Sequence, residues 1–284
     1  MKGIFEVDIF EIIKVIFLGI VEGITEWLPV SSTGHMILFD SFVKLPVSDA
    51  FKEMFFVVIQ LGAILAVAIT FFNTVNPFSL KKSKEEKKNT WNLIGKILVA
   101  CIPAGIVGLL FDDIIDEMFY NYITVAITLI IYGALFIIIE RMNKKPVITD
   151  LKSITYKIAL YIGMFQILAL IPGTSRSGAT IVGALLLGVG RVAASEFTFV
   201  LALPVMLGAS VYKLIKYVLE VGMYFSEFEI ISLVLGMAVA FVISIITIKF
   251  LLAYIKKNDF KVFGYYRIIL GIIVIVCGII GIIS

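Results

Sequence analysis

Two acidic side chains lie in an apolar stretch near the start of the chain. Glu22 and Glu26 are four residues apart, so on a helix they share one face, one turn apart. Two carboxylates this close repel each other, and in a low-dielectric environment they need a proton or a cation between them. A hard divalent ion such as Mg²⁺, held by carboxylates and substrate phosphates, meets that need. The alternative is that both face a water-filled vestibule and take no part in chemistry.

A hydroxyl and the only histidine of the chain follow directly. Ser32 and His35 are three residues apart, with Gly34 between them. This pair suits a nucleophile with its base, or a nucleophile with the acid that protonates the leaving group. A lone histidine is more often a packing residue, but the neighbouring hydroxyls of Ser31 and Thr33 and the two acids favour a catalytic role.

A second polar motif interrupts another apolar stretch. Ser175-Arg176-Ser177-Gly178 lies between two apolar half-helices. Small residues at a helix N-terminus offer backbone N–H groups to an anion, and the arginine adds a fork that fits phosphate oxygens. Arg176 could instead snorkel or pair with one of the glutamates, and Thr180 could donate a hydroxyl to the site or hydrogen-bond to its own helix.

Together the two motifs supply one histidine, one arginine, two acids and several hydroxyls. Polar side chains inside apolar segments are costly, and by default they mark a functional site. This set suits phosphoryl transfer, which depends on charge neutralisation and positioning. We expect both motifs to share one ligand between Arg176 and His35. Lys96, Arg191 and Arg267 are further polar residues in or next to the apolar segments, and the sequence assigns them no role in the site.

The elements that carry these motifs are expected to lie in a membrane. Hydrophobic residues make up 61% of the 284 residues and charged residues 16%, against about 45–50% and about 25% in soluble domains. The net charge of +3 comes mostly from loop lysines, so we expect no nucleic-acid partner. Cys101 and Cys277 lie in apolar runs and are interpreted as buried thiols. The acidic start of the chain lacks the basic n-region of a signal peptide.

The predicted fold class is an all-α polytopic membrane protein with two interrupted segments. Segments 10–38 and 158–190 are each broken near the middle by Pro, Gly and hydroxyl residues. Broken backbone at membrane depth is tolerated only where protein or water satisfies it, so we interpret both as re-entrant helix-loop-helix hairpins. Six other stretches have the roughly 20 apolar residues that a transmembrane helix needs. They are 53–72, 92–111, 121–140, 197–217, 229–254 and 264–283.

Charge in the predicted loops indicates the orientation. The breaks at 81–88, 141–157 and 256–261 are basic, whereas those at 112–117 and 218–228 are acidic. Short basic loops stay in the cytoplasm, and with six alternating spans all the basic loops fall on one side. The C-terminus is then on the outer side, the first hairpin enters from outside and the second enters from the cytoplasm.

The two interrupted segments also resemble each other. GIVEGITEWLPVSSTGHMI aligns with GMFQILALIPGTSRSGATI, which places Gln166 opposite Glu22 and Ala179 opposite His35. An odd number of spans per repeat inverts the second copy. We therefore predict inverted-topology repeats in a single membrane domain. Their bounds are 1–145 and 146–284, and each holds one hairpin and three spans.

EGITEWLPVSSTGHMI and PGTSRSGAT resemble the two signature motifs of the undecaprenyl-pyrophosphate phosphatases, the bacitracin-resistance family. The resemblance covers the chain in length, span count and motif order. It implies a phosphatase of the bacterial inner (plasma) membrane that hydrolyses undecaprenyl diphosphate and recycles the lipid carrier for cell-wall synthesis. It also implies a polyprenyl diphosphate lipid substrate, a divalent cation (Mg²⁺ or Ca²⁺) and an active site open to the outer face.

The same resemblance assigns roles to residues of both motifs. Glu22 and Glu26 correspond to the essential acidic pair and to the metal ligands, Ser32 to the nucleophile and His35 to its partner. Arg176 joins these catalytic residues. The expected substrate-binding set is Ser31, Thr33, Gly34, Ser175, Ser177, Gly178 and Thr180.

Two other functions fit part of the pattern. A transporter or flippase of polyprenyl phosphates would use the same arginine and hydroxyls to bind a headgroup, and broken helices in inverted repeats are common in transporters. An ion channel or membrane scaffold would need no histidine and would tolerate Ser32→Ala. The sequence does not determine the oligomeric state, and a homodimer is compatible with it.

Overall fold

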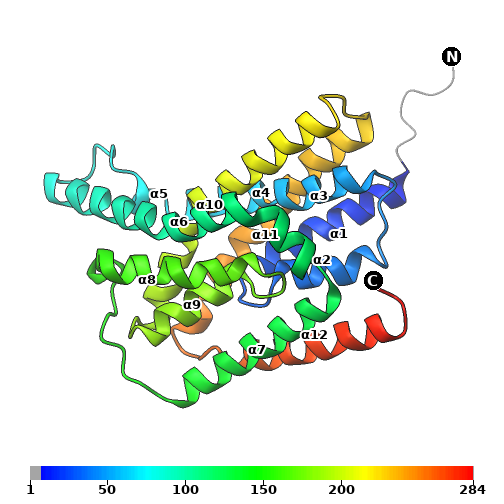
Figure 1. Ribbon diagram of the computed structural model, residues 1–284. Coiled ribbons are helices and arrows are strands. Elements are labelled where there is room, and N and C mark those ends of the chain that lie inside the picture. The colour runs from blue at the N-terminus through cyan, green and yellow to red at the C-terminus, as the bar shows by residue number, and fades with distance from the viewer. Residues whose placement is uncertain (1–7, 284) are drawn as a thin grey trace.

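The computed structural model describes residues 8–283 and shows an all-helical chain with no strand in that range (Figure 1). Residues 1–7 lie outside the described residues. They make up most of the acidic start of the chain, from which we predict that there is no signal peptide. Six helical stretches are long and apolar enough to cross a membrane, as predicted. They are Asp49–Thr70, Lys84–Phe119, Tyr122–Arg141, Arg191–Glu220, Glu227–Ile255 and Lys261–Ile279.

The first of these stretches is divided, and the other five are continuous. Helices α3 and α4 meet at Ile59, which caps both of them. The bounds are α3 (Asp49–Val58), α4 (Gln60–Thr70), α5 (Phe72–Val75), α6 (Lys84–Phe119), α7 (Tyr122–Arg141), α10 (Arg191–Glu220), α11 (Glu227–Ile255) and α12 (Lys261–Ile279).

Helix α6 is longer than the sequence predicts. The charged segments 81–88 and 112–117 are predicted to be breaks, but a single helix of 36 residues runs through most of both. At 1.5 Å per residue it is about 54 Å long, well beyond the roughly 30 Å hydrocarbon core of a bilayer. The prediction was wrong because charged turns beyond the apolar zone remain helical when water solvates them. Ser83 and Glu86 close the N-terminus in a capping box.

Each of the two interrupted segments consists of a helix, a loop and a second helix. Helices α1 (Ile9–Thr25) and α2 (Ser32–Asp40) form the first pair, and α8 (Tyr156–Ile167) and α9 (Arg176–Leu186) form the second. A 3-10 turn at Leu168–Leu170 extends α8 towards its loop. None of these four helices belongs to the membrane-spanning set, so the chain supplies two short helix pairs with loops between them.

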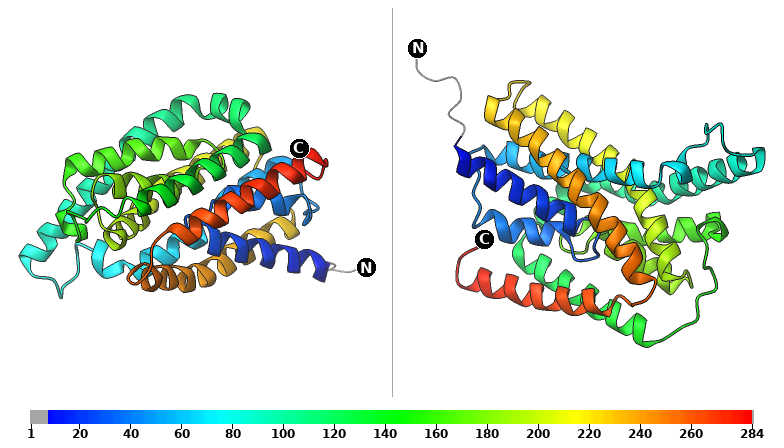
Figure 2. Two further views of the ribbon diagram at one scale, coloured as in Figure 1. Left: turned by 90° about the horizontal axis from the view of Figure 1, so that it is seen from below. Right: turned by 180° about the vertical axis from the view of Figure 1, so that it is seen from behind.

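The long helices pack against the two short pairs. Helix α7 lies along α12, α1 lies along α11, and α8 lies along α6, as Figures 1 and 2 show. Small residues permit close approach between α7 and α12. A methyl group on Gly133 would lie 2.7 Å from the Gly264 carbonyl oxygen, and one on Gly264 would lie 2.7 Å from the Gly133 carbonyl oxygen.

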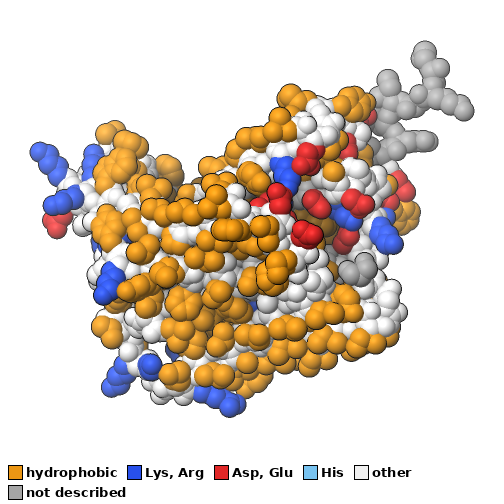
Figure 3. Space-filling view, viewed as in Figure 1, with side chains coloured by type: hydrophobic (Ala, Val, Ile, Leu, Met, Phe, Trp, Pro, Cys, Tyr) orange, Lys and Arg blue, Asp and Glu red, His pale blue; other side chains and the backbone are white. Residues whose placement is uncertain are grey.

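The surface is predominantly apolar between two charged ends. Figure 3 shows hydrophobic side chains over the middle of the molecule, mostly lysine and arginine at one end, and mostly acidic side chains with a few basic ones among them at the other. Exposed apolar side chains such as Ile127, Ile131 and Ile138 on α7 would be unfavourable in water. A lipid environment removes that penalty, which agrees with a multi-pass membrane protein.

We predict that Gly133→Ala and Gly264→Ala each destabilise the protein by about 1–3 kcal/mol, because the added methyl group forces α7 and α12 apart. Thermal unfolding of the purified protein in detergent measures this effect. Gly105→Ala is the matched control, because a methyl group there meets nothing within 4 Å. Equal melting temperatures for all three variants would contradict the packing described.

Candidate functional site

The two loops present their polar motifs in the same backbone conformation. Ser31 has φ 75° and Ser175 has φ 71°, in a region that residues other than glycine rarely adopt. Each serine caps the next helix: Ser31 Oγ accepts the Gly34 N–H at 3.2 Å, and Ser175 Oγ accepts the Gly178 N–H at 3.1 Å. Strain of this kind persists only where the surroundings enforce it, and it clusters at functional sites.

A buried arginine from α12 joins the two loops. Arg267 is 0% exposed and donates to the carbonyl oxygen of Pro29 at 3.1 Å and to those of Gly173 and Thr174 at 2.8 Å each. Its guanidinium lies 5.6 Å from the centre of the Tyr132 ring, and it forms no ion pair with an acid in residues 8–283. Arg267 therefore holds the loops together through backbone carbonyls, a larger role than the sequence indicates.

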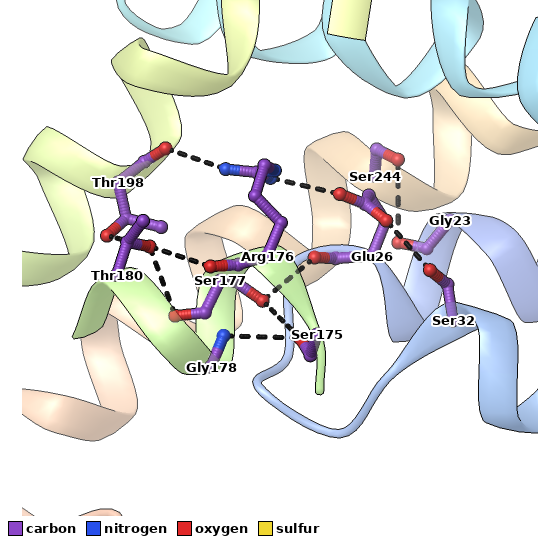
Figure 4. Close-up of polar contacts among 10 residues, drawn as sticks. All are labelled: Gly23, Glu26, Ser32, Ser175, Arg176, Ser177, Gly178, Thr180, Thr198 and Ser244. Carbon is purple, nitrogen blue, oxygen red and sulfur yellow. Dashed lines mark hydrogen bonds and ion pairs between the residues drawn. The ribbon is translucent and has the colours of Figure 1, made fainter. Parts of the chain in front are cut away.

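An ion pair then connects the two motifs directly. Arg176 Nη2 lies 2.9 Å from Glu26 Oε1, and Ser32 Oγ donates to Glu26 Oε2 at 2.9 Å (Figure 4). The other terminal nitrogen of Arg176 donates to the Thr198 carbonyl oxygen at 2.9 Å. The Arg176 guanidinium also lies 5.7 Å from the centre of the Trp27 ring. Both charges of the pair are largely buried, so this contact orients the arginine and the serine around one carboxylate.

These groups line a cavity of about 460 Å³. Its polar wall includes Glu26, Ser32, Thr33, Ser175 and Arg176. Most of the remaining wall consists of small and apolar residues of α6 and α10, with Asp112 and Tyr212 among them. The main ones are Cys101, Ala104, Gly105, Gly108, Leu109, Pro204, Val205, Met206, Gly208 and Ala209. A cavity with a charged wall and an apolar wall suits an amphiphile with an anionic headgroup.

The second acid lies behind the first. Glu22 is 1% exposed, does not line the cavity, and its Oε1 has no hydrogen-bond partner in the described part of the chain. Such an orphaned oxygen is costly unless a proton or a cation satisfies it. Within residues 8–283 no three His, Cys, Asp or Glu side chains cluster as metal ligands. Glu22 and Glu26 nevertheless offer the oxygen donors that Mg²⁺ or Ca²⁺ prefers, and Mg²⁺ commonly keeps water and phosphate oxygens as its other ligands.

The histidine has partners other than the expected ones. His35 Nδ1 lies 2.7 Å from the Ser31 carbonyl oxygen, so Nδ1–H donates there, and Nε2 lies 2.7 Å from the Tyr266 hydroxyl. The His35 ring also stacks on that tyrosine. Ser32 instead bonds to Glu26, and His35 is not among the residues that line the cavity. The structure therefore shows no Ser32–His35 hydrogen bond, and it places His35 outside the cavity that Arg176 lines.

Several predicted binding residues support the loops and do not line the cavity. Ser31, Gly34 and Gly178 form the helix caps described above. Ser177 Oγ donates to the Glu26 carbonyl oxygen at 3.3 Å. Thr180 is fully buried, donates to the Arg176 carbonyl oxygen at 2.9 Å and accepts from the Thr198 hydroxyl at 2.9 Å. Its hydroxyl thus bonds to its own helix, the alternative that the sequence left open.

Some of the other polar residues bind structural partners, and one residue of the cavity was not identified from the sequence. Lys96 donates to the Lys152 carbonyl oxygen in a short 3-10 helix, and Arg191 pairs with Glu140 at the basic end of the molecule. Gln166 lines the cavity, and the sequence assigned it no role. The alignment of the two motifs, which places Gln166 opposite Glu22, was the signal that could have identified Gln166 as a residue of the site. Cys101 and Cys277 are free and only partly buried, so the prediction of buried thiols was wrong.

Six candidate spans around a buried group of carboxylate, guanidinium and hydroxyl side chains define a multi-pass membrane protein with an internal polar site. The chain belongs to a known family of this class. The sequence profile of the family described as bacitracin resistance protein BacA matches residues 15–273. This match confirms the family that the two motifs predict.

Similar curated proteins carry the name undecaprenyl-diphosphatase. The protein of Enterococcus faecalis is 61% identical over 272 residues, which cover 94% of this chain and 97% of the relative. The protein of Acetivibrio thermocellus is 60% identical over 267 residues, covering 93% and 97% of the two chains. The protein of Desulfitobacterium hafniense is 60% identical over 268 residues, covering 93% and 95%.

We predict that Arg267→Met destabilises the protein by roughly 2–4 kcal/mol, because three carbonyl oxygens of the two loops lose their buried donor. Thermal unfolding in detergent measures the change. Arg141→Met is the matched control, since Arg141 is exposed at the end of α7 and forms no ion pair in the described chain. If both variants melt like the parent protein, Arg267 does not hold the loops together.

Proposed function

We propose that this chain is an undecaprenyl-diphosphatase, an integral membrane phosphatase that hydrolyses undecaprenyl diphosphate to undecaprenyl phosphate and inorganic phosphate. It thereby recycles the lipid carrier for cell-wall synthesis. The observation that carries the proposal is the contact of Glu26 with both Ser32 and Arg176 on the polar wall of an otherwise apolar cavity. The names of the relatives agree with it.

The headgroup binds at the polar wall and the prenyl chain lies along the apolar wall. Arg176 carries the positive charge that a diphosphate requires. Its terminal nitrogens donate to Glu26 and to the Thr198 carbonyl oxygen, so its Nε–H is the donor that is left for a phosphate oxygen. The apolar wall, formed by α6 and α10 and called the apolar slot below, is lined by glycines, alanines and aliphatic side chains. This lining suits an isoprenoid chain and leaves the rest of the tail in lipid. One ligand can therefore contact both walls at once.

Ser32 attacks the terminal phosphorus of the bound diphosphate. Its hydroxyl already donates to Glu26 Oε2 at 2.9 Å, so the proton passes to that carboxylate as the serine O–P bond forms. The bond between the terminal phosphorus and the bridging oxygen breaks, and undecaprenyl phosphate leaves. Water then attacks the phosphoserine: a new O–P bond forms as the serine O–P bond breaks, one proton of the water passes to the Ser32 oxygen and phosphate leaves. Glu26 releases its proton to solvent. In the alternative mechanism, water attacks directly and Ser32 only positions it.

Two further residues support this step. His35 acts as a positioning residue, because Nδ1–H fixes the carbonyl of Ser31, which precedes the nucleophile and caps α2. Glu22 and Glu26 would hold the divalent cation that the family resemblance implies. When bound, such an ion neutralises negative charge on the diphosphate.

The same proposal includes the arrangement in the membrane. The pairs α1–α2 and α8–α9 are re-entrant hairpins of two inverted repeats, 1–145 and 146–284. The matching backbone of Ser31 and Ser175 supports this. So does the pairing of each first hairpin helix with a long helix of the other half, α1 with α11 and α8 with α6.

Charge at the two ends supports an orientation in the bacterial inner membrane. The basic end seen in Figure 3 is cytoplasmic and the acidic end faces outwards. Asp112, from the acidic segment of α6, lines the cavity, which supports a site open to the outer face.

We expect Ser32→Ala to lower phosphate release from C15 and C55 prenyl diphosphates at least about a thousandfold, because the nucleophile is lost. Purified protein in detergent is the sample, since detergent leaves no compartments for transport. Trapping a phosphoserine at residue 32 distinguishes covalent catalysis from direct attack by water. Ser41→Ala is the matched control, because Ser41 caps the far end of α2.

The second part of this assay tests whether the activity needs a divalent cation, which a chelator removes. EDTA should lower phosphate release and added Mg²⁺ or Ca²⁺ should restore it. Full activity of the Ser32→Ala variant would contradict the proposed nucleophile. Absence of phosphate release by the parent protein, with transport of polyprenyl phosphate in vesicles, would favour the flippase alternative.

The apolar slot gives a separate prediction. Gly208→Leu should lower kcat/KM for the C55 diphosphate about tenfold, because the new side chain enters the space that the prenyl chain needs. A β-carbon at Gly208 meets nothing within 4 Å, so the variant should still fold, and its melting temperature checks this. Gly208→Ala is the control of smaller size. Unchanged kinetics for the leucine variant would place the prenyl chain elsewhere.

A further inference from the structure

One buried amide in the cavity wall has no hydrogen-bond partner. Gln166 lies near the end of α8, is 2% exposed and lines the cavity together with Glu26 and Arg176. Neither its Oε1 nor its Nε2 has a partner in the described part of the chain. An amide offers two donors and an acceptor, and buried polar groups without partners are rare in folded proteins.

The neighbouring arginine has an unpartnered donor as well. Arg176 uses one terminal nitrogen for Glu26 and the other for the Thr198 carbonyl oxygen, but its Nε has no partner among the described residues. Two side chains of the same cavity therefore have buried N–H donors that the described protein does not satisfy. Both donors have almost no exposed surface, so a ligand with acceptor oxygens satisfies them when the two side chains turn towards it at the cavity wall.

The chemical type of this residue agrees with an anionic ligand. Gln166 occupies the position in the second motif that Glu22 occupies in the first. A carboxylate lining the cavity there would repel a diphosphate, whereas a neutral amide can donate a hydrogen bond to it. The two halves thus place an acid behind the nucleophile and a neutral donor beside the ligand.

We propose that Gln166 is a substrate-binding residue whose amide N–H donates to a phosphate oxygen of the bound prenyl diphosphate, next to the Nε–H of Arg176. This assignment deepens the proposed function and rests on it. It explains why the protein keeps an amide where an apolar side chain would fill the same space without orphaned polar atoms. The stability lost at Gln166 is offset by affinity for the headgroup.

The test compares Gln166→Met, which keeps the size of the side chain, with Gln166→Glu, which adds a negative charge. Phosphate release from the C15 diphosphate gives KM and kcat, and thermal unfolding gives the stability of each variant. We expect KM to rise about tenfold for Gln166→Met, because a hydrogen bond to a charged group is lost. It should rise further for Gln166→Glu, while kcat changes less than KM.

A direct binding measurement completes the test. The dissociation constant for the C15 diphosphate is compared between Ser32→Ala and Ser32→Ala/Gln166→Met, which separates binding from turnover. We expect about tenfold weaker binding in the double variant. Gln166→Met alone should melt at the same temperature as the parent or higher, since the orphaned amide is gone. A residue with only a structural role would show the opposite, a lower melting temperature with unchanged affinity.

Met164→Leu is the matched control. Met164 lies on the same helix, is half exposed and does not line the cavity. The Met164→Leu variant should therefore keep the KM and kcat of the parent protein. If the parent protein releases no phosphate, the proposed function fails. If the parent is active and Gln166→Met keeps its KM and dissociation constant, only the assignment of Gln166 fails.

Discussion

The buried guanidinium of Arg267 is the constraint on which the site depends. It donates to carbonyl oxygens of both loops, and these loops have no regular backbone pairing of their own. Irregular backbone inside a membrane protein must find its hydrogen bonds within the protein. A single cation with several N–H donors meets this requirement for two loops at once. Because its partners are carbonyl dipoles, Arg267 adds no carboxylate near a site that must accept an anion.

The geometry of the polar site follows from that arrangement. Once the loops are held together, the helices that start from them bring Ser32 and Arg176 to the same carboxylate of Glu26. The left-handed conformations of Ser31 and Ser175 let each serine cap its helix within a tight turn. Strain in the two loops is therefore compensated by buried hydrogen bonds, which place the Ser32 hydroxyl at the start of α2 without a long supporting network.

The two halves are alike in backbone and different in chemistry. The first motif contributes the hydroxyl and the carboxylates, whereas the second contributes Arg176 and the amide of Gln166. The two loops share the positive φ of Ser31 and Ser175, whereas the side chains at matched positions differ. A polar wall beside an apolar slot then favours a ligand that is both charged and lipidic.

The sequence by itself determined the all-helical membrane class, the six apolar spans, the two interrupted segments and the two motifs. Each follows from local composition and spacing. Only the tertiary structure decided that Ser32 bonds to Glu26 and not to His35, that Thr180 bonds to its own helix, and that Arg267 joins the loops. Those choices depend on contacts between residues far apart in the chain. The local sequence pattern also predicted the wrong bounds for α6, because charged residues mark the edge of the apolar zone and not the end of the helix.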